Sequence, residues 1–430
     1  MIKSLETEKK RWIILIAACI CNVFAGTGYC WSVYQAGLVN EATTIFGSSN
    51  ITASVLAVAF SINAAVFPFT MIAGGLLQRK LEPSKIMIGS AVLILAGMFL
   101  SGTANNVYAI WLGFGIITGF GSGAVYGITI NNTINFFPDK KGLISGMTTC
   151  SFGLGSIIFP PIISDMIDNC GVLHTFKIMG ALIAAITVLS AFFISSCPRG
   201  WLPKDFIPDR SVKDIANEKT GNDRTWSEML KDVRFWLTAT VFMLFASAGL
   251  FIVSQSKQLA VIAGGLHETD NLSILTISIV GIANSVGRLI WGFASDKIGR
   301  LRSLISMALI LSIAAFALAC TSDNYKIFII CMISLACCYG GCMGIYPALT
   351  ADLFGEKNNS VNYGIMFLVF SVAAFVGPKF FTSLSEEFNS HSTSLYIISG
   401  FGLCAFALTF LLTRFSRKKI KLPKHSQFNL

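Results

Sequence analysis

The stretch ANSVGRLIWGFASDKIGR (residues 283–300) runs from an apolar segment into a charged turn, and it contains an arginine, Arg288, eight residues before Asp296. At about 1.5 Å per helical residue, Arg288 would lie about 12 Å deeper along the helix axis than Asp296. The apolar segment, residues 272–294, is long enough to cross a hydrocarbon core of about 30 Å. The stretch therefore predicts a membrane-spanning helix that carries a buried positive charge.

The rest of the chain repeats this apolar pattern. Of its 430 residues 54% are hydrophobic and 13% are charged, whereas soluble domains are about one quarter charged. Apolar windows of this length predict helices, because a helix satisfies its own backbone hydrogen bonds in lipid. The first window is too long for a signal peptide, so we expect it to remain as a span. We predict an all-α membrane protein with twelve transmembrane helices, at residues 12–36, 53–77, 86–103, 107–132, 143–167, 174–196, 235–256, 272–294, 302–320, 327–351, 361–384 and 393–414.

The basic residues indicate how these spans are oriented. Most of the 32 Lys and Arg precede the first span, follow an even-numbered span or lie in the tail; the exceptions are Lys177, Lys257, Arg288, Lys326 and Lys379. Basic loops face the cytoplasm in membrane proteins. We therefore expect both termini in the cytoplasm of a cell-membrane protein, and we attribute the net charge of +10 to topology rather than to nucleic-acid binding.

The chain also divides into two similar halves. A charged segment, residues 197–233, separates six predicted spans from six others, and FAGTG (24–28) is echoed by FASAG (245–249). GGLLQRK, which begins at Gly74, is echoed at nearly the same spacing by GFASDKI, which begins at Gly292. We predict an N-terminal six-helix half at 1–196, a cytoplasmic linker at 197–233 and a C-terminal half at 234–430, an arrangement of transporters that bind substrate between repeats.

Arg288 is the residue whose chemistry most needs an explanation. All 22 Asp and Glu lie in loops, in tails or near the ends of spans, and an uncompensated arginine at the membrane centre costs about 2.5–3.5 kcal/mol. A planar carboxylate on the transported molecule would suit its guanidinium. The alternatives are that Arg288 extends to the lipid head groups or bonds backbone carbonyls. Polar residues that could complete a small site are Tyr29 and Gln35 on one face of the first span, Tyr126 and Tyr339.

The sequence gives no pattern typical of an enzyme or a metal site. The 12 Cys show no paired CxxC spacing, and the four His fall in predicted loops or tails. No deep carboxylate pair or activated nucleophile is present. We expect no catalytic residue, no metal and no cofactor.

GFASDKIGR (292–300) resembles the loop signature of the major facilitator superfamily. The resemblance implies that superfamily's fold of two six-helix halves. It also implies a gating loop formed by Gly292, Asp296, Lys297, Gly299 and Arg300. The counterpart in the first half keeps Gly74 and Arg79 but has Gln78 where the signature has an acid.

FFPDKKGLISGM (136–147), the FGLGS that follows at 152–156, GYCWSVY (28–34) and ANSVGR (283–288) together resemble the oxalate/formate antiporter family, which is related to the monocarboxylate transporters. This resemblance implies that Arg288 binds a substrate carboxylate and that Tyr29, Gln35 and Tyr126 line the cavity. The lysine that gives the oxalate carrier a second positive charge corresponds to a position at or near Phe370. Asn284 occupies the position where proton-linked relatives carry an acid.

These features predict a monomeric secondary transporter of small organic anions that works by alternating access. Because one buried cation suits one carboxylate, we expect a monocarboxylate such as lactate, pyruvate or formate. An oxalate/formate exchanger and a carrier of neutral apolar solutes are the alternatives, and a non-transporting sensor that binds a partner through the linker is a third. Coupling to a counter-anion (antiport) or to a proton (symport) stays open.

Overall fold

The computed structural model describes residues 2–47, 51–198, 201–203, 223–262, 264–265, 271–320, 324–387 and 391–418. In these ranges twelve helices are long and apolar enough to cross a membrane, as predicted. Most of residues 197–233, the predicted linker, lies outside the described residues.

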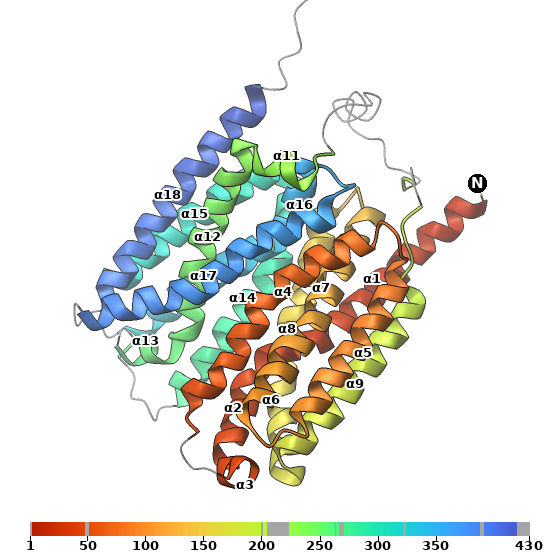
Figure 1. The fold of residues 1–430 in the computed structure, drawn as a ribbon. Helices are drawn as coiled ribbons and strands as arrows, with labels where there is room; N and C mark the ends of the chain where they lie inside the picture. The colour runs from red at the N-terminus through yellow and green to blue at the C-terminus, as the bar shows by residue number, and fades with distance from the viewer. Residues whose placement is uncertain are drawn as a thin grey trace, which may run out of the picture.

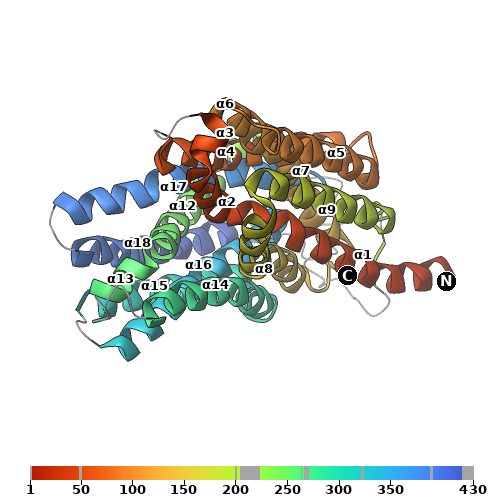
Figure 2. The ribbon, with the colours of Figure 1, turned by 90° about the horizontal axis from the view of Figure 1, so that it is seen from below.

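The first six spans form one bundle (Figures 1 and 2). Its elements are α1 Ile2–Ala25, η1 Gly26–Cys30, α2 Trp31–Asn40, α3 Ala42–Phe46, α4 Ala53–Leu77, α5 Pro83–Ser101, α6 Val107–Ile110, η2 Trp111–Thr118, α7 Gly119–Phe136, α8 Lys141–Cys170 and α9 Val172–Phe193. The first span is not one continuous α-helix, because the 3₁₀ segment η1 separates α1 from α2. Glycine at positions 26 and 28 lowers the conformational energy of such an interruption.

The other six spans form the second bundle. Its elements are α11 Trp226–Leu230, α12 Val233–Ser254, α13 Ser256–Ile262, α14 Asn271–Ile298, α15 Arg300–Cys320, α16 Tyr325–Phe354, α17 Asn359–Glu387 and α18 His391–Lys418. Gly299 separates α14 from α15 with φ +94°, a conformation that glycine adopts without a steric penalty. The charged turn of residues 292–300 therefore ends one span and starts the next.

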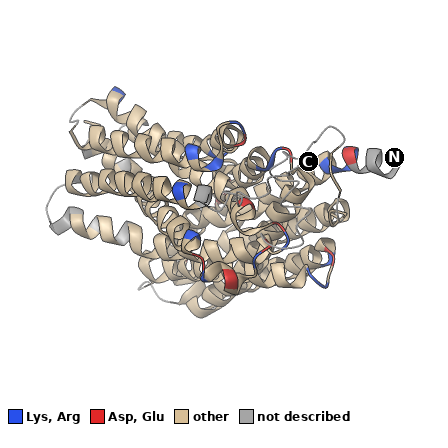
Figure 3. Cartoon of the chain, turned by 90° about the horizontal axis from the view of Figure 1, so that it is seen from above, with Lys and Arg blue, Asp and Glu red and all other residues tan. Residues whose placement is uncertain are grey.

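Two pairs of long helices join the bundles. α14 packs along α8, and α17 packs along α4, with α16 also touching α8. Figure 1 shows α17 crossing beside α4. We call the end of the molecule that carries α11 and the start of α8 the linker end. Seen from that side in Figure 3, many charged segments lie at helix ends, whereas most of the helix surface is uncharged.

Candidate substrate site

Arg288 lies in the middle of the interface between the two halves. A Cβ added at Gly146 of α8 or at Gly344 of α16 would collide with the backbone carbonyl oxygen of Arg288. Glycine at these positions lets α14 fit closely between α8 of the other half and α16 of its own half. The Arg288 side chain is buried, with 4% of its surface exposed, so it does not extend to the lipid head groups.

Neutral oxygens hold the guanidinium. Nη1 donates to the backbone oxygen of Thr149 at 2.7 Å, while Nη2 and Nε donate to Oδ1 of Asn284 at 3.1 and 3.3 Å. Within the described residues no acid forms a salt bridge with Arg288. Since a guanidinium has five N–H donors, these three bonds leave one N–H on each terminal nitrogen. A carboxylate is a suitable acceptor for such donors, and the Tyr29 hydroxyl lies next to them.

Three predicted tyrosines lie around this charge. The charge of Arg288 acts on the hydroxyls of Tyr29, Tyr126 and Tyr339, and the hydroxyl of Tyr29 is also its hydrogen-bonding neighbour. Tyr29 belongs to η1, Tyr126 to α7 and Tyr339 to α16, so both halves contribute. A fourth tyrosine, Tyr363 of α17, experiences the same charge. Tyr363 was not predictable from the sequence, because nothing in NYG (362–364) distinguishes it from a packing residue.

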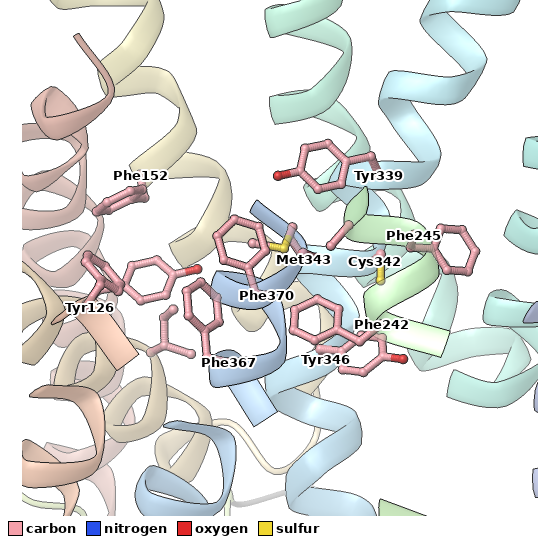
Figure 4. Close-up of a cluster of buried hydrophobic side chains, with 14 of the residues drawn as sticks. Tyr126, Phe152, Phe242, Phe245, Tyr339, Cys342, Met343, Tyr346, Phe367 and Phe370 are labelled. Carbon is pink, nitrogen blue, oxygen red and sulfur yellow. The ribbon is translucent and has the colours of Figure 1, made fainter. Parts of the chain in front are cut away.

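An aromatic cavity opens beside this group. It has an empty volume of about 580 Å³, its open mouth included, and is lined by Ala25, Gly28, Tyr29, Phe60, Asn63, Ala64, Phe67, Ser122, Phe152, Leu250, Phe367, Phe370 and Ala374. Phe370 lies on this wall, with its ring centroid 4.7 Å from that of Phe367. Figure 4 shows Phe367 and Phe370 between Tyr126 and Phe152 on one side and Phe242 and Tyr346 on the other.

Arg288, in contrast, is absent from the cavity lining. Phe152 lines the cavity, and its neighbour Gly153 is close to the guanidinium, since a Cβ added there would lie 3.5 Å from Cζ of Arg288. Tyr29 packs edge-on against Phe152 at 5.3 Å, and Tyr126 does so at 4.8 Å. Tyr29 and Phe152 therefore connect the cavity wall with the surroundings of Arg288.

Gln35 lies elsewhere. Its Nε2 donates to the backbone oxygen of Ala53 at 2.9 Å, and it does not line the cavity. The prediction placed Tyr29 and Gln35 on one face of a continuous helix. Residues six apart already point about 120° away from each other on a continuous α-helix, so the two side chains do not share one face.

The charged turn after α14 closes the linker end. The two oxygens of Asp296 accept hydrogen bonds from the backbone N–H groups of Gly142 and Leu143 at 2.8 and 2.7 Å. These are among the first residues of α8, where N–H groups lack partners in their own helix and a negative charge is favoured. Arg300 pairs with Asp296 at 2.7 Å and with Asp352 at 3.1 Å, and Lys141 of the other half also pairs with Asp352 at 3.1 Å.

The remaining residues of the predicted gating loop have other contacts. A Cβ at Gly292 would collide with the backbone oxygen of Gly142, so this glycine also permits the contact between α14 and α8. Lys297 lies over the Phe293 ring at 4.5 Å, and Gly299 shapes the turn. Gly292 and Asp296 therefore touch the other half directly, while Lys297 does not join the charge network of Asp296 and Arg300.

The matching turn in the first half makes a neutral version of this contact. The spacing along the chain that separates Gly74 from Gly292 also separates Gln78 from Asp296 and Gly142 from Ser360. Correspondingly, Oε1 of Gln78 accepts a hydrogen bond from Ser360 at the start of α17, at 2.8 Å. Arg79 donates to Oδ1 of Asn358 at 2.7 Å, and Asn359 donates to Asn131 at 2.7 Å. At the linker end both contacts between the halves are thus hydrogen-bonded, one with a carboxylate and the other without one.

Comparison with known proteins agrees with this architecture. The sequence matches the Major Facilitator Superfamily over residues 18–378, with a second match over 258–428. It is 28% identical to the oxalate:formate antiporter of Oxalobacter formigenes over 97% of this chain and 95% of that protein. It is 24% identical to the apicoplast pyruvate carrier 1 of Toxoplasma gondii over 68% of this chain and 63% of that protein.

Among solved structures, the proton:xylose symporter XylE has the same fold, with a TM-score of 0.72, 14% identity and coverage of 94% of this chain and 96% of that one. Its low identity makes it evidence for the fold alone. The twelve spans, the paired halves and the match over most of the sequence show that the chain belongs to the major facilitator superfamily, and so is a secondary transporter of the membrane rather than an enzyme.

Proposed function

We propose that this transporter carries small monocarboxylates such as lactate, pyruvate or formate, with the substrate carboxylate bound by Arg288. The observation that carries the proposal is the buried guanidinium, which is held by neutral oxygens and forms no salt bridge with an acid in the described part of the chain. In a site of low dielectric constant, an anion and this cation would neutralise each other. The names of two relatives, an oxalate:formate antiporter and a pyruvate carrier, support a carboxylate substrate.

A single negative charge fits the site better than two. Arg11 is the other buried basic side chain among the described residues, and it lies near the linker end, paired with Glu8 and Asp139 at 2.7 and 3.1 Å. Phe370 contributes an apolar ring to the cavity wall. A second carboxylate placed there would lose its hydration without gaining a cation. This favours a monoanion over oxalate.

The described conformation suits one stage of alternating access, with the linker end closed by Asp296, Arg300 and Lys141 and an open-mouthed cavity beside the tyrosines. We propose that the linker end faces the cytoplasm of a cell membrane, in accord with the basic loops. Substrate would enter past Tyr29 and Phe152, reach Arg288, and leave after the linker-end contacts separate. Asn284 cannot take part in proton exchange, which favours antiport or a proton route elsewhere.

Counterflow in liposomes tests this function. Vesicles containing the purified protein are loaded in turn with lactate, pyruvate, formate, oxalate or a neutral apolar solute, and uptake of the labelled compound is measured. We expect exchange with the monocarboxylates, and its loss in Arg288→Gln with the protein still folded in the membrane. Arg302→Gln, which changes an exposed arginine at the linker end, is the matched control and keeps exchange.

Each contrary result has a distinct meaning. Normal lactate exchange by Arg288→Gln would remove Arg288 from the binding site. If oxalate displaced lactate in competition, the argument from Phe370 would be wrong and the oxalate/formate exchanger would be favoured. Exchange of the neutral solute without any carboxylate exchange would refute the proposal as a whole.

A further inference from the structure

The last part of the linker is bound to the C-terminal half at the turn between α16 and α17. The backbone N–H of Arg224 donates to the backbone oxygen of Phe354 at 2.9 Å. The backbone oxygen of Arg224 accepts from the Nδ2 atoms of Asn358 and Asn362, both at 3.0 Å. α11, which follows, lies at the linker end near α16 (Figure 1). We call residues 223–230 the linker strap; it is held by buried amides, since both asparagines are buried.

Asn358 also forms part of the contact between the two halves. Its Oδ1 accepts from Nη2 of Arg79 at 2.7 Å, and Arg79 belongs to the N-terminal half, in the turn after α4. One planar amide therefore binds Arg79 through its oxygen and Arg224 through its nitrogen. Fixing the nitrogen side fixes the direction of the oxygen, and a chain of hydrogen bonds that begins at a cation strengthens each of its members.

Asn362 holds the strap in a different way. Among the hydrogen bonds of the described residues, its side chain bonds only to the backbone oxygen of Arg224, and its buried Oδ1 has no partner there. An unmet buried acceptor costs stability, so the benefit of this amide lies in its bond to the strap. The chain thus has one asparagine that binds both the strap and the other half, and a second that binds the strap.

The strap is docked at the contact that lacks a carboxylate. Asp296 of the second half bonds directly to the start of α8, whereas the corresponding Gln78 of the first half bonds to Ser360. Arg79 accordingly meets a neutral acceptor, Asn358, at this contact. A neutral amide attracts a guanidinium less strongly than an acid does, so this contact depends more on how well the amide is oriented.

We propose that the linker strap is a latch for the closed linker end. While Arg224 is docked, Asn358 is held in the direction that accepts from Arg79, and when the strap detaches this contact between the halves weakens. Because such coupling is reciprocal, opening of the linker end also loosens the strap. The linker is then a regulatory element of alternating access and not only a connection between the halves. This inference goes beyond the proposed function, because none of these contacts involves the substrate.

Hydrogen exchange tests the latch without substrate. The amides of Gly142 and Leu143 donate to Asp296 across the closed interface, so they exchange when the linker end opens. Asn362→Ala weakens the docking of the strap, and we expect the exchange to rise by about two- to tenfold, the range for one hydrogen bond of ordinary strength. In Arg79→Ala the exchange should already be faster than in the wild type. Adding Asn362→Ala to Arg79→Ala should change it no further, because the strap then has no contact between the halves to hold.

A second variant loosens the strap from its exposed side, in case Asn362→Ala does not fold. Oδ1 of Asp223 accepts from the backbone N–H of Lys357 at 3.2 Å, and Asp223 is exposed. Asp223→Ala should speed the exchange of the same two amides by about twofold or more. This rise should also be absent when Arg79→Ala is present.

Asn132→Ala is the matched control. Nδ2 of Asn132 donates to the backbone oxygen of Ser195 at 3.0 Å, within the N-terminal half and just before the linker. The variant loses the same kind of bond as Asn362→Ala but leaves the strap docked, so it should keep the wild-type exchange. Equal rises in Asn132→Ala and Asn362→Ala would identify a general loss of stability and would overturn the proposal.

Two other results would also overturn the latch. If folded Asn362→Ala or Asp223→Ala kept the wild-type exchange, docking of the strap would be independent of closure. If the rise were equally large in the presence of Arg79→Ala, the strap would act without the bond between Asn358 and Arg79. Either result would leave the proposed function intact, since counterflow of the acids tests that function separately.

Discussion

Gly146 and Gly344 allow a sharp test of how the two halves move, because both approach the same atom. A Cβ at Gly344 would lie 2.5 Å from the carbonyl oxygen of Arg288, and a Cβ at Gly146 would lie slightly closer to it. Gly344 belongs to α16, in the same half as Arg288, whereas Gly146 belongs to α8 of the other half. Adding one methyl group at Gly344 therefore strains the fold of the C-terminal half. Adding one at Gly146 strains the contact between the two halves.

The size of each effect follows from this difference. Overpacking by a methyl group costs about 1–3 kcal/mol, while alanine in place of glycine stabilises a helix by about 1 kcal/mol. In Gly146→Ala the clash exists only while the linker end is closed, whereas the extra helix stability from alanine is present in both the closed and the open state. The equilibrium between the closed and the open linker end should therefore shift toward the open state by the full free energy of the clash, which is about 5- to 150-fold. In Gly344→Ala the clash persists in all folded states, and the net loss of stability is at most about 2 kcal/mol.

Hydrogen exchange of the Gly142 and Leu143 amides measures the opening, since both amides donate to Asp296 across the closed interface. With the substrate-free protein, Gly146→Ala should speed their exchange by the same 5- to 150-fold with little change in melting temperature. Gly344→Ala should lower the melting temperature and affect these amides much less. If Gly146→Ala left the exchange unchanged, or if both variants lost stability equally, the contact at Gly146 would be a fixed part of the fold and not a surface that separates.

Two further predictions concern charge. Phe370→Lys would place a cation at the wall of the cavity, so oxalate should compete with lactate at least about tenfold better than in the wild type; unchanged competition would show that this side chain does not face the substrate. Partial burial raises the pKa of Asp232, but its hydrogen bonds with Arg234 and the charges of Arg234 and Arg224 outweigh this and hold the pKa below its ordinary value of 3.8. The stability from this lowered pKa is complete above pH 3.8 and is lost as the pH falls through the folded pKa. Exchange of the Arg234 amide, bonded to Asp232 at 2.9 Å, should rise in that acid range, and Asp232→Asn should remove the dependence; a wild-type profile in that variant would contradict the argument.

Much of the architecture was predictable because the membrane imposes simple rules. Twelve apolar windows gave twelve spans, since each span must cross the same hydrocarbon thickness with its backbone groups paired. The echo of GGLLQRK in GFASDKI indicated the two halves, and the structure places Gln78 and Asp296 at equivalent contacts. The interruption at Gly26–Cys30 was not predicted. Hydropathy does not register a break of five residues inside an apolar run.

The sequence by itself determined the class of the protein, the positions of its spans and the presence of one deep arginine without an acid near it in the chain. These depend on local composition and on distance from a charged turn. Only the tertiary structure decided that the Thr149 carbonyl of the other half holds Arg288, and that Tyr29, Phe152 and Phe370 line one cavity. Those facts depend on which helices of the two halves meet, and residues as far apart as Thr149 and Arg288 become neighbours only when the bundles pack.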